Sequence, residues 1–153
     1  MMSISIDIDV DMADAIARMS GMKARSHDFT TVLVWARGEL EKSNAANFAA
    51  NGLPSGRSWS PLDPGYARWK SANFPGRPTM VRSGRLFRSL TNMKGAPSFI
   101  RRDVAEFGTG VEYAKFHQSG TFKMPKRQVV FEPPLFAKRL GMKAADYVAN
   151  GVI

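Results

Sequence analysis

The sequence predicts a single α+β domain, in which N-terminal helices and a C-terminal helix pack on a small, mostly antiparallel sheet. Its 153 residues fit one domain, and a hydrophobic fraction of 44% suffices for one core. Residues 28–50 carry apolar side chains at helical spacing, whereas short apolar runs between Gly- and Pro-rich stretches follow residue 53. No internal repeat or second domain boundary is evident, so we expect residues 1–153 to form one domain.

The N-terminal region predicts one strand and two helices. Residues 4–10 alternate apolar and polar side chains, which is the pattern of a half-buried strand; such a strand joins the protein's own sheet or reaches a neighbour as an arm. Asp11 can cap a helix that starts near Met12 and continues to Gly21. A second helix is expected over 28–50, where Asn51 and Gly52 end it.

The middle of the chain predicts a loop, a short helix and an extended segment. Residues 51–62 are rich in Gly, Pro and Ser and carry Trp59 as an anchor. Pro64 after Asp63 is a strong helix start, so residues 66–72 are expected to be helical. Ser83 then caps or turns into the segment GRLFRSL, after which we expect extended chain towards Met93.

The remaining elements are a strand, a helix, another strand and a final helix. After a turn at 95–97, residues 99–107 are expected to pair with the extended chain before the turn. The stretch VEYAKFHQ reads as a short helix that ends at Gly120. A basic loop leads to a strand over 128–131, and Pro133 and Pro134 open an amphipathic helix that reaches Val148.

Several function classes find no support in the composition. The chain has no cysteine, which excludes disulfides and thiolate chemistry and fits a cytoplasmic site of synthesis. No apolar run approaches the ~18–20 residues of a membrane span, and the N-terminus is acidic where a signal peptide is basic. His27 and His117 lack a second ligand at i+4, and no nucleophile elbow or phosphate-binding glycine loop is present. We expect no catalytic residue, cofactor or metal.

The charge is distributed unevenly along the chain. Residues 1–52 hold five Lys or Arg against seven Asp or Glu, whereas residues 53–153 hold 17 basic against six acidic residues. The net charge of the whole sequence is +9. A basic surface of this kind suits a polyanion or an acidic protein partner. Cations also alternate with aromatic residues, as at Arg57 and Trp59, which supports an alternative function as a nucleic-acid-binding module. The competing interpretation is that these aromatics are core and their cations point outward.

Three blocks carry a resemblance to a known family. They are NFAANGLPSGRSWSPLDPGYARWK at 47–70, MVRSGRLFRSL at 80–90 and FGTGVEYAKFHQSGTFKMPKRQVVF at 107–131. In this order and spacing they resemble the phage virion morphogenesis (tail completion) family of Mu-like and related tailed phages. The sequence departs from the family pattern at Ser119, where a hydrophobic residue is usual, and after Arg127, where Gln128 and Val129 stand in place of Pro-Phe.

The resemblance implies a structural subunit at the head-tail junction, located in the neck or upper tail of the virion and assembled in the bacterial cytoplasm. It implies a ring of copies, with six favoured and twelve as the alternative, through which genomic DNA passes. Portal or adaptor, neck and tail-tube proteins would be its neighbours, and no membrane is involved. The motif and interaction residues are Trp59, Pro61, Leu62, Gly84, Leu86, Tyr113, His117, Gln118, Gly120, Phe122, Met124, Pro125 and Arg127.

Within these blocks, two loops and one short helix receive specific roles. We expect Tyr113, His117 and Gln118 to hydrogen-bond to backbone and fix the loop that follows, with Gly120 permitting its tight bend. Loops 51–62 and 119–127 are expected to be interaction loops that insert apolar side chains into a neighbouring subunit.

Overall fold

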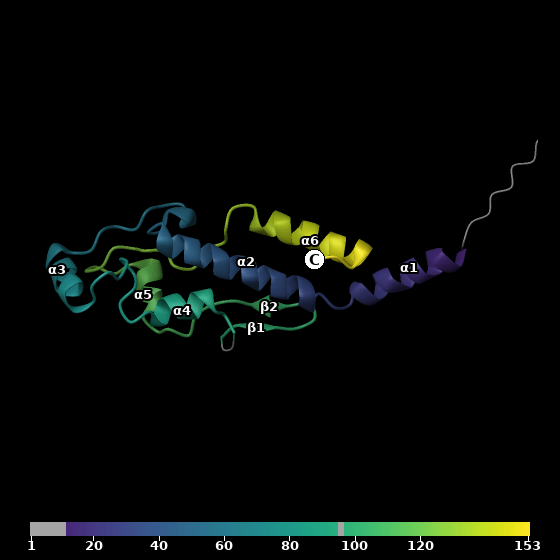
Figure 1. The fold of residues 1–153 in the computed structure, drawn as a ribbon, viewed down its shortest axis with the longest axis horizontal. Coiled ribbons are helices and arrows are strands. Elements are labelled where there is room, and N and C mark those ends of the chain that lie inside the picture. Colours follow the sequence, from purple (N-terminus) through teal and green to yellow (C-terminus); the bar gives the residue numbers. More distant parts are fainter. Residues whose placement is uncertain (1–11, 95–96) are drawn as a thin grey trace, which may run out of the picture.

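A twenty-residue helix, α2 (Thr30–Ala49), runs through the middle of the molecule in the computed structural model, which describes residues 12–94 and 97–153 (Figure 1). Helix α6 (Phe136–Asn150) packs on one side of α2, and α4 (Arg85–Thr91) and strand β1 (Phe99–Ile100) pack on the other. Helix α1 (Met12–Arg25) extends one end of the molecule, and α3 (Pro64–Asn73) and α5 (Ala114–Ser119) form the opposite end. A short 3-10 helix, η1 (Leu53–Ser55), follows α2.

The α+β class is confirmed by six α-helices and a small antiparallel sheet in the described residues. The sheet consists of β1 and β2 (Ala105–Glu106), with Phe99 opposite Glu106 and Ile100 opposite Ala105. Because α4, α6 and β1 all contact α2, this helix is the element around which the others are arranged. The predicted strand or arm at 4–10 lies outside the described residues.

The core lies beside the C-terminal half of α2. Phe48 packs edge-on against both Trp59 and Phe87, each with a ring-centroid distance of 5.3 Å. The rest of the cluster comes from the second half of the chain: Val81, Leu86, Leu90, Val111, Ala114 and Val129. The predicted anchoring role of Trp59 is thus confirmed, since only 7% of its surface is exposed. Trp59 therefore lies in its own subunit's core and is not one of the loop side chains that could insert into a neighbouring subunit.

Helix α1 is longer than the sequence predicted, because it continues through Gly21 to Arg25. A glycine inside a helix costs only about 1 kcal/mol relative to alanine, which tertiary contacts can offset. Such contacts come from Arg25, whose guanidinium donates to the backbone oxygens of Val148 (2.9 Å) and Ala149 (3.1 Å). These are carbonyls near the C-terminal end of α6, where a cation is favourable.

The predicted strand over 99–107 and its pairing are wrong in the structure. Helix α4 continues to Thr91, so little extended chain precedes the turn, and residues 99–106 fold back on themselves as the β1–β2 hairpin. The helical conformation is favoured over an extended one because Leu86 and Leu90, one helical turn apart, are both buried in the core.

The predicted strand at 128–131 is also absent, and side chains replace the strand partner. The backbone amides of Val129 and Val130 both donate to Gln118 Oε1, at 3.0 Å each. The backbone oxygen of Gln128 accepts from Asn47 Nδ2 (3.2 Å) and Trp59 Nε1 (2.9 Å). These three backbone groups of the segment are therefore paired without a ladder.

Candidate interaction site

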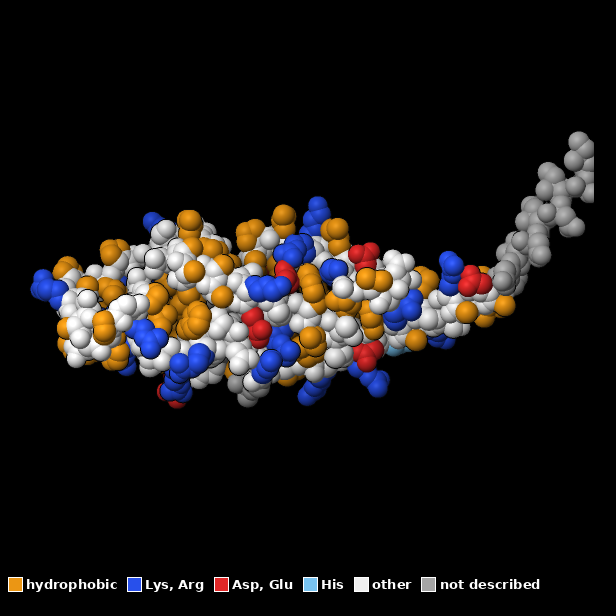
Figure 2. All heavy atoms as spheres, viewed as in Figure 1, with side chains coloured by type: hydrophobic (Ala, Val, Ile, Leu, Met, Phe, Trp, Pro, Cys, Tyr) orange, Lys and Arg blue, Asp and Glu red, His pale blue; other side chains and the backbone are white. Residues whose placement is uncertain are grey.

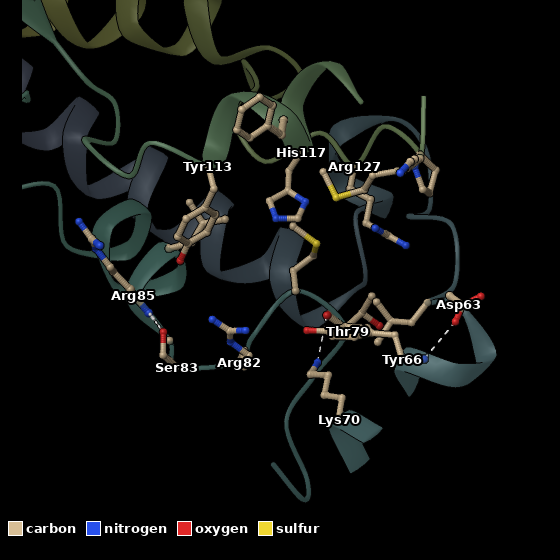
Figure 3. Close-up of a pocket in the computed structure, with 18 residues that line it drawn as sticks. Asp63, Tyr66, Lys70, Thr79, Arg82, Ser83, Arg85, Tyr113, His117 and Arg127 are labelled. Carbon is tan, nitrogen blue, oxygen red and sulfur yellow. Dashed lines mark hydrogen bonds between the residues drawn. The ribbon is translucent and has the colours of Figure 1, made fainter. Parts of the chain in front are cut away.

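The three sequence blocks meet around one cavity of about 560 Å³, at the end of the molecule formed by α3, α4 and α5 (Figure 3). Helix α3 starts at Pro64 because Asp63 accepts a hydrogen bond from the amide of Tyr66 at 3.0 Å, as the sequence predicted. In Figure 3, Tyr113 and His117 lie on one side of the cavity, and Arg82 and Lys70 lie across from them.

Eight of the thirteen predicted motif residues line this cavity. They are Leu62, Gly84, Leu86, Tyr113, His117, Met124, Pro125 and Arg127. Of the other five, Trp59 is in the core, Gln118 pins the segment after the cavity, and Phe122 is fully exposed. Pro61 accepts a hydrogen bond from Arg127, and Gly120 forms the bend that returns the chain to the cavity.

Arg127 holds the two predicted interaction loops together. Its guanidinium is buried and donates from Nε to the backbone oxygen of Ser60 at 2.9 Å, and from a terminal nitrogen to that of Pro61 at 2.8 Å. Its backbone amide donates to the backbone oxygen of His117 at 2.7 Å. Burial lowers the pKa of Arg127. Loops 51–62 and 119–127 are consequently linked through one side chain.

Gln118 hydrogen-bonds to backbone as predicted, whereas the same expectation for His117 is not met. Both ends of the Gln118 amide are used: Oε1 accepts from two backbone amides, and Nε2 donates to the backbone oxygen of Val130 at 2.7 Å. By contrast, His117 Nδ1 is buried without a hydrogen-bond partner. The ring of Tyr113 meets that of His117 edge-on, at 6.0 Å between centroids. Gln118 therefore fixes the chain beyond the loop, and His117 contributes ring packing.

Lys70 is a cavity residue that the sequence analysis missed. Only 4% of its surface is exposed, and Nζ donates to the backbone oxygens of Arg77 (3.3 Å), Pro78 and Thr79 (3.0 Å). Burial lowers the pKa of Lys70. Its three donors match three carbonyls of the loop after α3, which leaves no ammonium proton free for a ligand. The Gly- and Pro-rich loop after α3 was the sequence signal that could have indicated this role, because such loops leave backbone carbonyls that need a donor.

A model of the phage virion morphogenesis family matches residues 10–147. The chain belongs to this family. The resemblance seen in three blocks is thus confirmed, and the match extends beyond residues 47–131 to the N-terminal helices and most of α6. No curated protein and no solved structure matches the chain. Membership supports a structural role in virion morphogenesis.

In this member of the virion morphogenesis family, the cavity has an apolar interior and a cationic rim. Arg82, Arg85 and Lys123 are exposed at its edge, and within the described residues none of them lies at ion-pair distance from a carboxylate. Asp63 is the one carboxylate among the described lining residues, and it caps α3. The site therefore favours an occupant that is both apolar and negatively charged.

The described residues contain neither a metal-binding cluster nor a membrane-spanning helix. No three side chains among His, Asp and Glu gather there into a set that could hold a metal ion. In the same parts of the chain, no helix combines the length and apolarity needed to cross a bilayer.

His117 is expected to make stability depend on pH. Burial, and then the positive charge of Arg127, lower the pKa of His117 below its ordinary value of about 6.5. The unfolded chain therefore takes up a proton near pH 6.5 while the folded protein does not, and the free energy of unfolding falls as the pH drops from there towards the folded-state pKa. Urea titrations at a series of pH values should show this fall.

The variant His117→Leu tests the source of that pH dependence. It removes the titrating ring and the unpaired nitrogen, so the fall between neutral and mildly acidic pH should flatten. The variant His27→Gln, at the exposed second histidine, is the control and should keep the wild-type slope. Equal slopes for wild type and His117→Leu would show that other groups cause the effect.

Proposed function

We propose that this protein is a non-enzymatic subunit of a ring in the neck or upper tail of a tailed phage, where it completes the tail for joining to the DNA-filled head. Family membership supports the morphogenesis role. Six copies are favoured and twelve are the alternative, with portal or adaptor, neck and tail-tube proteins above and below and the genome passing through the lumen.

Exposed apolar side chains at both ends of the elongated subunit carry this proposal (Figure 2). On α1, Ile16 and Met19 are 58% and 69% exposed and lie on one face, three residues apart. At the other end, Phe122 is fully exposed and Phe116 is 47% exposed. Rings form from head-to-tail contacts between two different surfaces, and contiguous exposed apolar residues mark such contacts.

The substitution Phe122→Asp tests the proposed role in head-tail joining. Because Phe122 is fully exposed and does not pack in its own subunit's core, the variant should fold with an unchanged unfolding midpoint. A charge buried in the contact between subunits should block assembly. In a phage whose own copy of the gene is deleted, we expect wild-type chain to restore infectious particles. With Phe122→Asp we expect filled heads and separate tails by electron microscopy.

A matched variant separates this outcome from a general effect of surface charge. Val104→Asp changes an exposed apolar residue in the β1–β2 turn, which lies beside the start of α2 and away from the α3–α5 end (Figure 1). It should support normal particle yield. Infectious particles at wild-type yield with Phe122→Asp would contradict the proposed contact, and joined particles in the complete absence of the chain would contradict the proposed function.

A further inference from the structure

The N-terminal segment has the chemistry that the cavity favours. Ile4, Ile6, Ile8 and Val10 alternate with polar residues, and residues 1–11 contain Asp7, Asp9 and Asp11 but no Lys or Arg. In an extended conformation this alternation places the apolar side chains on one face and the carboxylates on the other. The segment is thus apolar and negatively charged at once.

The cavity offers complementary groups for both faces. Leu62, Met80, Leu86 and Met124 supply an apolar lining. Arg82, Arg85 and Lys123 stand around it, and long cationic side chains can bend towards a bound carboxylate while their stems cover apolar surface. Because these three cations have no carboxylate partner within the described residues, an acidic segment would not have to displace one.

The geometry excludes the chain's own N-terminal segment as the occupant. Helices α1 and α2 follow one another along the long axis, and the cavity lies beyond the far end of α2 (Figures 1 and 3). With 14 and 20 residues, these helices span roughly 50 Å together. Eleven residues before Met12 reach at most about 40 Å when fully extended. A chain's own N-terminal segment therefore cannot occupy its own cavity.

We propose that the cavity between α3, α4 and α5 binds residues 4–10 of a neighbouring copy of this chain, with the apolar face inward and the aspartates at the cationic rim. The proposal rests on the ring arrangement proposed above and specifies one of its contacts. This contact is heterologous, because the α1 end of one subunit meets the α3–α5 end of the next. Repetition of the contact can close a ring.

Peptide binding tests the proposal directly. A synthetic peptide of residues 2–12, with a fluorophore at its C-terminus, is titrated with the full chain and followed by fluorescence anisotropy. We expect saturable binding that weakens with added salt. The double variant Arg82→Glu, Arg85→Glu should weaken binding about tenfold or more, because two attractive charges become repulsive.

Two controls assign the effect to the cavity. The double variant Arg57→Glu, Arg68→Glu makes the same change in net charge at exposed residues that do not line the cavity, and it should change affinity by less than about twofold. A peptide with Asp7→Lys and Asp9→Lys should lose binding to the wild-type chain. This peptide keeps the test valid if the cavity variant does not fold.

A photo-cross-link on the full chain gives a second readout. With benzoylphenylalanine in place of Ile6, irradiation should join two copies, and the modified residue should be one that lines the cavity. The proposal would be overturned if the peptide did not bind, or if both double variants weakened binding equally. It would also be overturned if duplex DNA carrying the same total negative charge displaced the peptide, or if the cross-links lay outside the cavity. None of these outcomes bears on whether the chain is needed for head-tail joining, which the phage complementation decides separately.

Discussion

Replacing Gly120 with alanine is expected to destabilise the protein by about 3 kcal/mol or more, because two independent costs add. The backbone at Gly120 has φ 77° and ψ 172°, a conformation that is essentially restricted to glycine. An added Cβ would also lie 2.9 Å from the backbone nitrogen and 3.2 Å from the Cα of Lys126. The second cost involves main-chain atoms, which cannot rotate away.

Urea unfolding of Gly120→Ala and Gly76→Ala would compare a crowded, glycine-restricted position with an uncrowded one. Gly76 also has a positive φ, of 72°, but a Cβ there meets nothing within 4 Å. Gly76→Ala should therefore show only the conformational cost, about 1 kcal/mol. Equal losses of stability would show that neither the unusual backbone conformation of Gly120 nor its close approach to Lys126 adds to the cost.

The substitution Arg127→Leu is expected to lower the free energy of unfolding by about 2–4 kcal/mol. The backbone oxygens of Ser60 and Pro61 would lose their charged donors, and the connection between loops 51–62 and 119–127 would disappear. Hydrogen exchange should then show faster opening of both loops. The leucine retains apolar bulk, so the loss reports the hydrogen bonds more than a cavity.

The neighbouring substitution Lys126→Leu is the control for Arg127→Leu. Lys126 is exposed and forms no ion pair within the described residues, so its replacement should change stability by less than about 0.5 kcal/mol. A comparable effect from the two substitutions would indicate that loss of positive charge, rather than loss of the buried contacts, matters.

The sequence was informative where local signals decide the structure. Helix α2 was expected over 28–50 and is found at Thr30–Ala49, and α3 begins where the Asp63–Pro64 pair predicted. The short helix ending at Gly120 was also predicted correctly. In each case a cap, a proline or a glycine lies within a few residues of the element that it limits.

Predictions failed where the decisive partner is far away in the sequence. The strand over 128–131 was expected because its residues suit a strand, but its partners are side chains of Gln118, Asn47 and Trp59. No local pattern shows that a glutamine amide will take the place of a neighbouring strand. The same limit applies to Asn44, which is buried and donates to the backbone oxygen of Leu90 at 2.9 Å.

The candidate site was predicted in part. The motif blocks contain most of the residues that line the cavity, yet their convergence depends on how α3, α4 and α5 pack. Lys70 went unnoticed because a buried lysine is rare and its three carbonyl partners come from the following loop. His117 drew attention as a rare residue type, whereas Gln118 makes the hydrogen bonds.

The contacts of Trp59 and Arg127 bear on how the protein folds as it is synthesised. Trp59 Nε1 donates to Gln128, 69 positions later, and the guanidinium of Arg127 reaches back 67 positions to Ser60. Translation supplies residues in order, at about 5–20 per second, so loop 51–62 emerges several seconds before the residues that hold it. Its indole and unpaired carbonyls stay available to chaperones or to premature association during that interval. The cavity end can close only after residue 128 has been synthesised, because Arg127 and Gln128 supply these contacts.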